Sequence, residues 1–219
     1  TNLQDILEEL AFMLFEKKID KAGFEGERAL LEKILNYLIL INSKIGIKIA
    51  KEVAKSDNMT LSIAGLKSLC LSNNKIVLKY LNDFYLKWSD NDLVLEKWFE
   101  MMSSLNLDLE GINHIKTLME HKSFDIKNPN KLRSVLGVFQ KENILLFHAE
   151  DSSGYNFISE QISIIDKKNP QVAARLILPL TRFKNYNKDR KNKIRKVLKN
   201  ILNQKPSIDL SEIIEKALM

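Results

Sequence analysis

Hydrophobic residues recur at the α-helical repeat along nearly the whole chain. Near its two ends, side chains at this spacing form one apolar face each: Leu3, Ile6, Leu7, Leu10 and Leu14, and Ile194, Val197, Leu198, Ile201 and Leu202. Such faces pack against other helices in a core. The pattern predicts about eleven or twelve helices, at residues 2–17, 26–41, 44–55, 59–71, 74–87, 92–103, 106–119, 129–141, 153–167, 170–182, 187–203 and 208–218. No run of alternating polarity is long enough to predict a strand.

Side chains that can cap a helix stand at the start of several predicted segments: Asp92, Asn128, Asn169 and Ser207. Their oxygen atoms can accept hydrogen bonds from first-turn backbone amides that have no partner within the helix. Both asparagines precede a proline, which suits the first helical position because its missing N–H is not needed there. These positions predict helix starts independently of the hydrophobic pattern.

The lengths of the helices and of their connections predict how they stack. Most segments have about 11–17 residues and most connections only two to six, which favours antiparallel neighbours in chain order. Residues 26–41 are apolar on nearly every side, so we expect this helix to be covered on two faces in an inner layer. No repeat of fixed period is visible. We therefore predict an all-α fold, an irregular two-layer helical superhelix (an α-solenoid of the HEAT or armadillo kind), as a single domain over residues 1–219.

Composition excludes some classes of protein. Of the 219 residues, 45% are apolar and 28% are charged, which is ordinary for a soluble globular protein. No window of eighteen apolar residues is present, so we expect no membrane span and no membrane partner. The single cysteine, Cys70, fits a reducing compartment, and no signal peptide is visible, so we expect a cytoplasmic location. Because the chain begins at Thr1 inside a helical pattern, we expect it to be a fragment of something longer.

The chain offers little for metal binding. Its histidines, His114, His121 and His148, are never four residues apart, the sequence His-Glu-x-x-His is absent, and Cys70 has no second cysteine. Two histidines at that helical spacing, or several cysteines, would be needed for a zinc site. We therefore expect this chain to bind no metal and to hold no catalytic residue of its own.

The run from His148 to Ser153 holds a histidine, two acids and two serines, the residue types of a catalytic triad. Residues adjacent in sequence rarely point at one another, however, and true triads assemble from distant positions. We favour the alternative, in which Asp151 or Ser152 caps the helix at 153–167 and His148 makes a local hydrogen bond.

Five aromatic residues gather around the turn at residues 88–92: Phe84, Tyr85, Trp88, Trp98 and Phe99. Aromatic side chains at helical spacing usually pack one helix pair against the next. We interpret these residues as core, with a peptide-binding groove as the alternative.

Positive charge is concentrated between Arg182 and Lys199. This segment holds nine Lys or Arg residues and one acid, Asp189, so its local charge of +8 exceeds the +6 of the whole chain. Such a stripe could contact the phosphates of a nucleic acid, or it could be the solvated face of a lysine-rich helix. Only Phe183 and Tyr186 are aromatic there, too few to suggest base stacking, so we do not expect a nucleic acid partner.

Two positively charged residues are harder to explain as ordinary surface. Arg133 lies beside the apolar stripe of the helix at 129–141, with Gly137 one turn further on the same side. A glycine inside a helix costs about 1 kcal/mol relative to alanine, which suggests that something approaches closely there.

In the helix at 170–182, Gln171 and Arg175 are one turn apart and project together. Pro179 removes the amide that would bond the carbonyl of Arg175, so the helix should bend or end just beyond it. An amide and a guanidinium side by side can present donors to a peptide carbonyl or a terminal carboxylate. The alternative for both arginines is an ordinary surface ion pair, which contributes little.

Several ordered motifs make the chain similar to the C-terminal domain of bacterial-type aminopeptidase N, a zinc metallo-aminopeptidase family. They are Asn128-Pro129-Asn130 with Arg133, then Phe147-His148-Ala149-Glu150-Asp151 with Gly154-Tyr155 and Phe157, then Asn169-Pro170-Gln171-Val172-Ala173-Ala174-Arg175-Leu176. Upstream, Asn58-Met59-Thr60, Lys87-Trp88 and Lys97-Trp98-Phe99 also match the family. The resemblance covers roughly residues 25–219. Two departures are Lys122, where the family usually has proline, and Ser152, where it usually has glycine.

The resemblance implies a helical lid packed on a thermolysin-like catalytic domain of the same polypeptide. In the family this lid closes most of the chamber that holds the zinc, and the residues matching Arg133, Gln171 and Arg175 meet the C-terminal side of the peptide substrate. The zinc-binding helix and the catalytic glutamates lie in domains absent from this chain. The function this implies is that of the C-terminal domain of an aminopeptidase, and the alternative is a freestanding α-solenoid that binds a protein or a nucleic acid.

Overall fold

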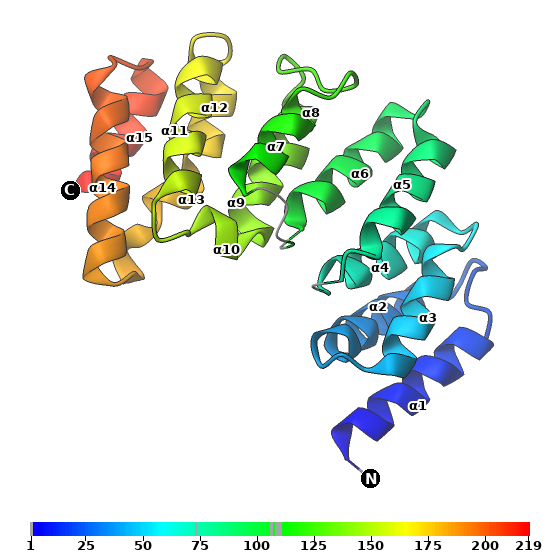
Figure 1. Ribbon diagram of the computed structural model, residues 1–219. Coiled ribbons are helices and arrows are strands. Elements are labelled where there is room, and N and C mark those ends of the chain that lie inside the picture. The colour runs from blue at the N-terminus through cyan, green and yellow to red at the C-terminus, as the bar shows by residue number, and fades with distance from the viewer. Residues whose placement is uncertain (1, 73, 106, 108–110) are drawn as a thin grey trace. The chain divides into compact units, whose positions relative to one another are not determined.

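The computed structural model describes residues 2–72, 74–105, 107 and 111–219, and its described part consists of helices and their connections, with no strand (Figure 1). The all-α prediction is therefore confirmed. The packing divides the chain into two compact units, residues 1–107 and 108–219. The single domain over residues 1–219 stays a prediction.

The first unit contains six helices in its described part. They are α1 (Leu3–Glu16), α2 (Glu25–Leu40), α3 (Lys44–Ala54), α4 (Met59–Cys70), α5 (Val77–Trp88) and α6 (Asp92–Ser104). Helix α4 contacts α2, α3, α5 and α6. The approach of α3 and α4 is close because Gly65 has no side chain: a Cβ there would lie 2.5 Å from the Ala54 backbone nitrogen.

The apolar surfaces of α1 and α2 are less covered than their sequences suggest. In α1 only Ala11 is buried, and Leu3 is 71% exposed. Helix α2 contacts α1, α3 and α4 and buries Leu31 and Leu35, yet Leu40 remains 60% exposed. That α2 is covered on two faces stays a prediction: three neighbouring helices contact it, and they leave part of its surface open.

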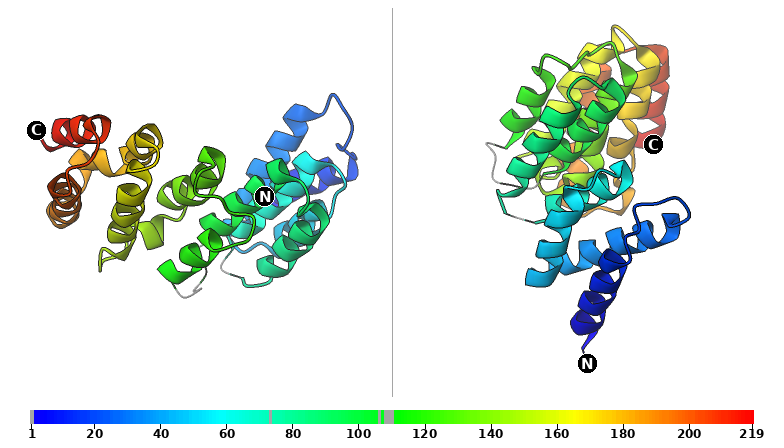
Figure 2. Two further views of the ribbon diagram at one scale, coloured as in Figure 1. Left: turned by 90° about the horizontal axis from the view of Figure 1, so that it is seen from above. Right: turned by 90° about the vertical axis from the view of Figure 1, so that its right-hand side faces the viewer.

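The second unit consists of shorter pieces. They are α7 (Ile112–Met119), α8 (Pro129–Leu132), the π-helix η1 (Arg133–Gly137), α9 (Val138–Glu142), α10 (Ile144–Phe147), α11 (Ser153–Asp166), α12 (Pro170–Leu176), α13 (Leu178–Thr181), the 3-10 turn η2 (Phe183–Asn185), α14 (Lys188–Asn203) and α15 (Ile208–Leu218). Helices α14 and α15 contact each other and run side by side (Figure 2). No helix in the described part of the chain is both long and apolar enough to cross a membrane.

Buried aromatic rings form the centre of the second unit. Phe139 packs edge-on against Phe147 and Phe157, with ring centroids 5.8 and 6.1 Å apart. Tyr155 in turn packs edge-on against Phe147 at 5.3 Å. Such edge-to-face pairs add to the stability gained from burial alone. In the first unit Phe84, Trp98 and Phe99 are buried as predicted, whereas Tyr85 and Trp88 are half-buried.

Three of the four predicted caps are confirmed. The side chains of Asn128, Asn169 and Ser207 accept hydrogen bonds from first-turn amides of α8, α12 and α15. The prediction for Asp92 is wrong by one residue: Asn91 is the cap, and its side chain accepts from the amide of Val94 at 3.2 Å. Both residues are good caps, so sequence alone did not separate them.

Helix ends and interruptions differ from the predicted segments. The helix expected at 129–141 contains a π turn, the helix expected at 170–182 divides at Ile177, and the short helix α10 was not expected. Of the helix expected at 106–119, residues 106 and 108–110 lie outside the described residues, and α7 begins at Ile112. The interruption at Ile177 follows from Pro179, as predicted.

Candidate functional site

The start of helix α8 places Arg133 on the surface of the second unit. Asn128 caps the helix through its side-chain oxygen, and Pro129 occupies the first helical position. Arg133 is exposed, and its Nε donates to the Pro129 carbonyl at 3.2 Å. Its Nη2 donates to the side-chain oxygen of Asn130. Two hydrogen bonds therefore hold the guanidinium against the first turn of α8.

A π turn begins at Arg133. The amide of Val138 donates to the Arg133 carbonyl, five residues earlier, and such turns are often found at functional sites. Gly137 lies beside Arg133 as predicted, because a Cβ added there would meet the Cβ of Arg133 at 3.8 Å. That is an ordinary contact distance, so within the described residues nothing approaches Gly137 closely enough to require a glycine.

Gln171 and Arg175 lie one turn apart on helix α12, whose other side is buried in the second unit. Both side chains are exposed, whereas Val172, Ala173 and Leu176 are buried. Asn169 caps this helix, accepting from the Val172 amide at 3.2 Å. Neither Gln171 nor Arg175 has a side-chain hydrogen bond or ion pair with a residue that the structure describes.

The elements that carry the three predicted residues are in contact, since α12 packs against η1. Tertiary structure thus brings together two segments that are about forty residues apart in the sequence. Two fixed positive charges and one amide are exposed on them, which can attract and orient an anionic or carbonyl-rich ligand. No carboxylate among the described residues lies within ion-pair distance of Arg133 or Arg175.

A second polar cluster surrounds His148, at the end of α10. His148 Nδ1 and the Tyr155 hydroxyl share a hydrogen bond of 2.6 Å, and Arg190 Nη2 donates to the His148 carbonyl at 3.5 Å. Burial, and then the charge of Arg190, lower the pKa of His148, while burial raises the pKa of Tyr155 to about 12. Both groups are therefore neutral near pH 7, and the phenol can donate a hydrogen bond to the imidazole.

The surroundings of His148 do not form a triad. Ser152 occupies the cap position of α11 without a capping bond from its side chain, and Asp151, one residue earlier, accepts from the amide of Ser153 at 2.9 Å. Ser152 has φ of 64°, the left-handed region that glycine adopts without strain, which accounts for the glycine expected here from the resemblance. His148 faces Tyr155 instead of a serine. The local interpretation of this run is confirmed. Residues 148–150 line a small polar recess of about 270 Å³ together with Asn187 and Lys193.

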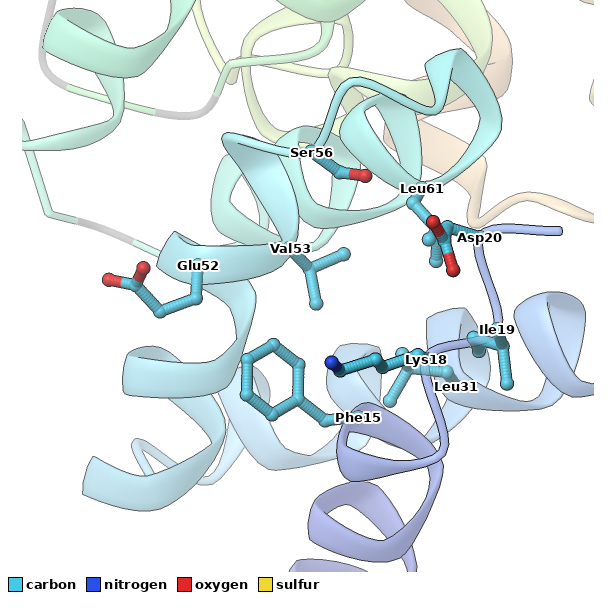
Figure 3. Close-up of a pocket in the computed structure, with 9 residues that line it drawn as sticks. All are labelled: Phe15, Lys18, Ile19, Asp20, Leu31, Glu52, Val53, Ser56 and Leu61. Atoms are coloured by element: carbon cyan, nitrogen blue, oxygen red, sulfur yellow. The ribbon is translucent and has the colours of Figure 1, made fainter.

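Sequence reasoning missed a mainly apolar pocket in the first unit (Figure 3). It has a volume of about 260 Å³ and is lined by Phe15, Leu31, Val53 and Leu61, and also by the charged residues Lys18, Asp20 and Glu52. The loop beside it is held by the buried Arg28, whose guanidinium donates to backbone carbonyls. The pocket brings together residues from four helices, so no local pattern in the sequence predicts it.

Seven of the nine basic residues of the segment Arg182–Lys199 lie on α14, and Arg182 and Lys184 precede it. Ile194, Leu198 and Ile201 are buried on the opposite side, so the charges occupy the polar face of an amphipathic helix. Some are already engaged: Lys193 pairs with Asp189 at 2.6 Å. The Arg195 guanidinium lies 5.7 Å from the ring centre of Phe183.

No group of three or more His, Cys, Asp or Glu side chains in the described residues could hold a metal ion. Cys70 is buried in α4. The residues of this chain that the structure describes therefore do not fit a zinc site.

Comparison with known proteins extends over most of the chain. A family model described as a domain of unknown function (DUF3458_C) with ARM repeats matches residues 2–219. Aminopeptidase N of Escherichia coli is 34% identical over 195 residues, which are 88% of this chain and 22% of that protein. Aminopeptidase N of Haemophilus influenzae is 35% identical over 196 residues, 87% of this chain and 22% of that protein.

A solved structure is also similar. Aminopeptidase A of Legionella pneumophila, in complex with aspartic acid, matches with a TM-score of 0.79 and 28% identity over 88% of this chain and 23% of that chain. The chain thus spans about a fifth of the length of the relatives it matches. The ARM-repeat description agrees with the expected armadillo-like architecture, and the resemblance to aminopeptidase N is confirmed. The chain belongs to the DUF3458_C ARM-repeat family and matches the C-terminal domain of aminopeptidase N.

Proposed function

We propose that this chain is the C-terminal domain of a zinc-dependent aminopeptidase that releases N-terminal residues from peptides. The observation that carries the proposal is the identity of 34–35% with two aminopeptidases N over nearly nine-tenths of the chain. The proposal includes a cytoplasmic location and a catalytic domain in the same polypeptide, against which this domain packs.

Within that enzyme, the domain closes the active-site chamber and contacts the C-terminal side of the substrate. Arg133, Gln171 and Arg175 supply the contacts. Support comes from their exposure and from the packing of α12 against η1. Guanidinium groups bind carboxylates through two parallel hydrogen bonds, and the exposed amide of Gln171 can donate to a peptide carbonyl.

Zinc would supply the nucleophile by lowering the pKa of a bound water, and its ligands would come from outside this chain. Arg133, Gln171 and Arg175 bind and orient the peptide, and the domain as a whole keeps bulk water out of the chamber. Positioning by residues remote from the reacting atoms can contribute much of a rate enhancement.

Studying the chain separately from the rest of the enzyme tests whether zinc binding and hydrolysis require residues outside it. The isolated chain should bind no stoichiometric zinc and should hydrolyse no aminoacyl arylamide, because its described residues offer no set of ligands. The complete polypeptide should contain His-Glu-x-x-His and should lose activity with a chelator. Metal analysis that finds one tightly bound zinc per isolated chain would contradict the proposal, as would a complete polypeptide that lacks the motif.

The alternative is a freestanding α-solenoid, and the basic face of α14 is the observation that favours a nucleic acid as its partner. If that face is only solvated, affinity for DNA or RNA should be weak, independent of sequence, and lost between about 50 and 200 mM salt as counterions are released. Filter binding across this range measures it.

Charge reversal provides the matched control. Lys196→Glu with Lys199→Glu on α14 should abolish the residual low-salt binding, whereas Lys44→Glu with Lys48→Glu on the exposed side of α3 should reduce it much less. Submicromolar, sequence-selective binding at physiological salt would support the α-solenoid alternative instead.

A further inference from the structure

The guanidinium of Arg133 uses only one of its edges within the domain. Nε and Nη2 form one side of the planar group, and this side is occupied by the Pro129 carbonyl and the Asn130 side-chain oxygen. Nη1 donates no hydrogen bond to any described residue. The end of the group, formed by Nη1 and the second hydrogen of Nη2, is therefore open in an exposed side chain. That end has the geometry that receives the two oxygens of a carboxylate.

Asn130 is available for this contact because another residue caps the helix. Asn128 accepts from the amides of Asn130 and Lys131, so the side chain of Asn130, at the second helical position, has no capping task. Its oxygen faces Arg133 three residues later, one turn along the helix. The backbone carbonyl of Pro129 supplies the second anchor and stays in place whatever side chains surround it.

Two anchors on one guanidinium reduce the number of conformations that an exposed arginine samples. A long charged side chain otherwise loses that freedom when its ligand binds, which weakens the binding. The contrast within the domain is Arg175, whose side chain has no hydrogen-bond partner among the described residues. The two arginines would thus act differently: Arg133 is held in advance, whereas Arg175 becomes ordered with the ligand.

We propose that Asn130 is a positioning residue that holds Arg133 with its open end towards the terminal carboxylate of the peptide. This inference rests on the proposed function, because it assumes that Arg133 faces the substrate chamber. It adds a residue to the site and a substrate class: peptides whose C-terminus is free are preferred over the same peptides with the C-terminus amidated.

The experiment compares the complete peptidase and its Asn130→Ala variant on a tripeptide and on the same tripeptide amide. The variant removes one of the two bonds that hold Arg133 and leaves the bond to Pro129, so KM for the free tripeptide should rise only about threefold to tenfold, the effect of a typical net hydrogen bond, with kcat unchanged and the amide nearly unaffected. Asn130→Leu, which keeps the size of the side chain but has no polar atom to accept from Arg133, should behave alike. Asn113→Ala is the matched control, an exposed asparagine at the second position of α7, and should change neither constant.

The variants Arg133→Ala and Asn130→Ala, alone and together, distinguish the positioning role of Asn130 from the proposed function of Arg133. In an Arg133→Ala enzyme, adding Asn130→Ala should raise KM no further, because Asn130 acts through the arginine. If Arg133→Ala itself leaves the preference for the free carboxylate intact, the proposed function of Arg133 fails. If Arg133→Ala removes that preference but Asn130→Ala and Asn130→Leu do not weaken it, only the positioning role is overturned. A further KM increase in the double variant would also overturn it.

Discussion

In the complete peptidase, Arg175→Ala is expected to raise KM for tri- and tetrapeptides about tenfold to a hundredfold. A hydrogen bond between an arginine and a carboxylate in a partly desolvated site contributes about 1.5–3 kcal/mol, and its loss appears in KM when it contributes equally to the bound substrate and the transition state. Arg175 is exposed and has no side-chain partner among the described residues. Its removal therefore breaks no ion pair within the described part of the domain.

Two controls locate the effect at the C-terminal side of the peptide. A chromogenic substrate with one amino acid and no terminal carboxylate should be affected much less, because its contacts stay near the reacting bond. Arg182→Ala removes a second exposed arginine just beyond α13 and should leave both substrates unchanged. Thermal denaturation should change little, since an exposed side chain of this kind costs under about 0.5 kcal/mol. Equal losses on both substrates, or a large drop in stability, would make Arg175 a structural residue.

Gly154→Ala is expected to destabilise the second unit by about 3 kcal/mol, the upper part of the range for overpacking. A Cβ at this position would lie 2.4 Å from the Phe147 carbonyl oxygen and 2.7 Å from that of Leu146. Both neighbours are backbone atoms of α10, so no side chain can turn away to make room. The start of α11 must move, and Tyr155 moves with it.

Urea denaturation of the chain measures this cost, with Gly137→Ala as the matched control. Gly137 is also helical, but its nearest neighbour is a side-chain carbon at 3.8 Å, so alanine there should be neutral or stabilising by up to about 1 kcal/mol. In Gly154→Ala the 2.6 Å bond between His148 and Tyr155 should also lengthen, and burial would then raise the pKa of the phenol less. A Gly154→Ala protein as stable as the parent would contradict this prediction and show that the backbone of α10 moves away at little cost in free energy.

Local sequence patterns predicted most of the helices, because each is encoded by residues within a few turns of one another. The periodicity of α14 and the caps at Asn128, Asn169 and Ser207 are examples. The same reasoning failed where two local solutions are nearly equal in energy. Asn91 and Asp92 can both cap α6, and no single residue in 129–141 distinguishes a π turn from an α-helix.

The amino-acid sequence by itself determined the helical class, the break after Arg175 and the absence of a His-Glu-x-x-His motif. It also supplied the three candidate residues, through motifs whose order matches a family. Only the tertiary structure decided which of their elements touch, since η1 and α12 meet through packing between segments far apart in the chain. It also decided how Arg133 is held, because the direction of a guanidinium depends on the acceptors that folding places around it.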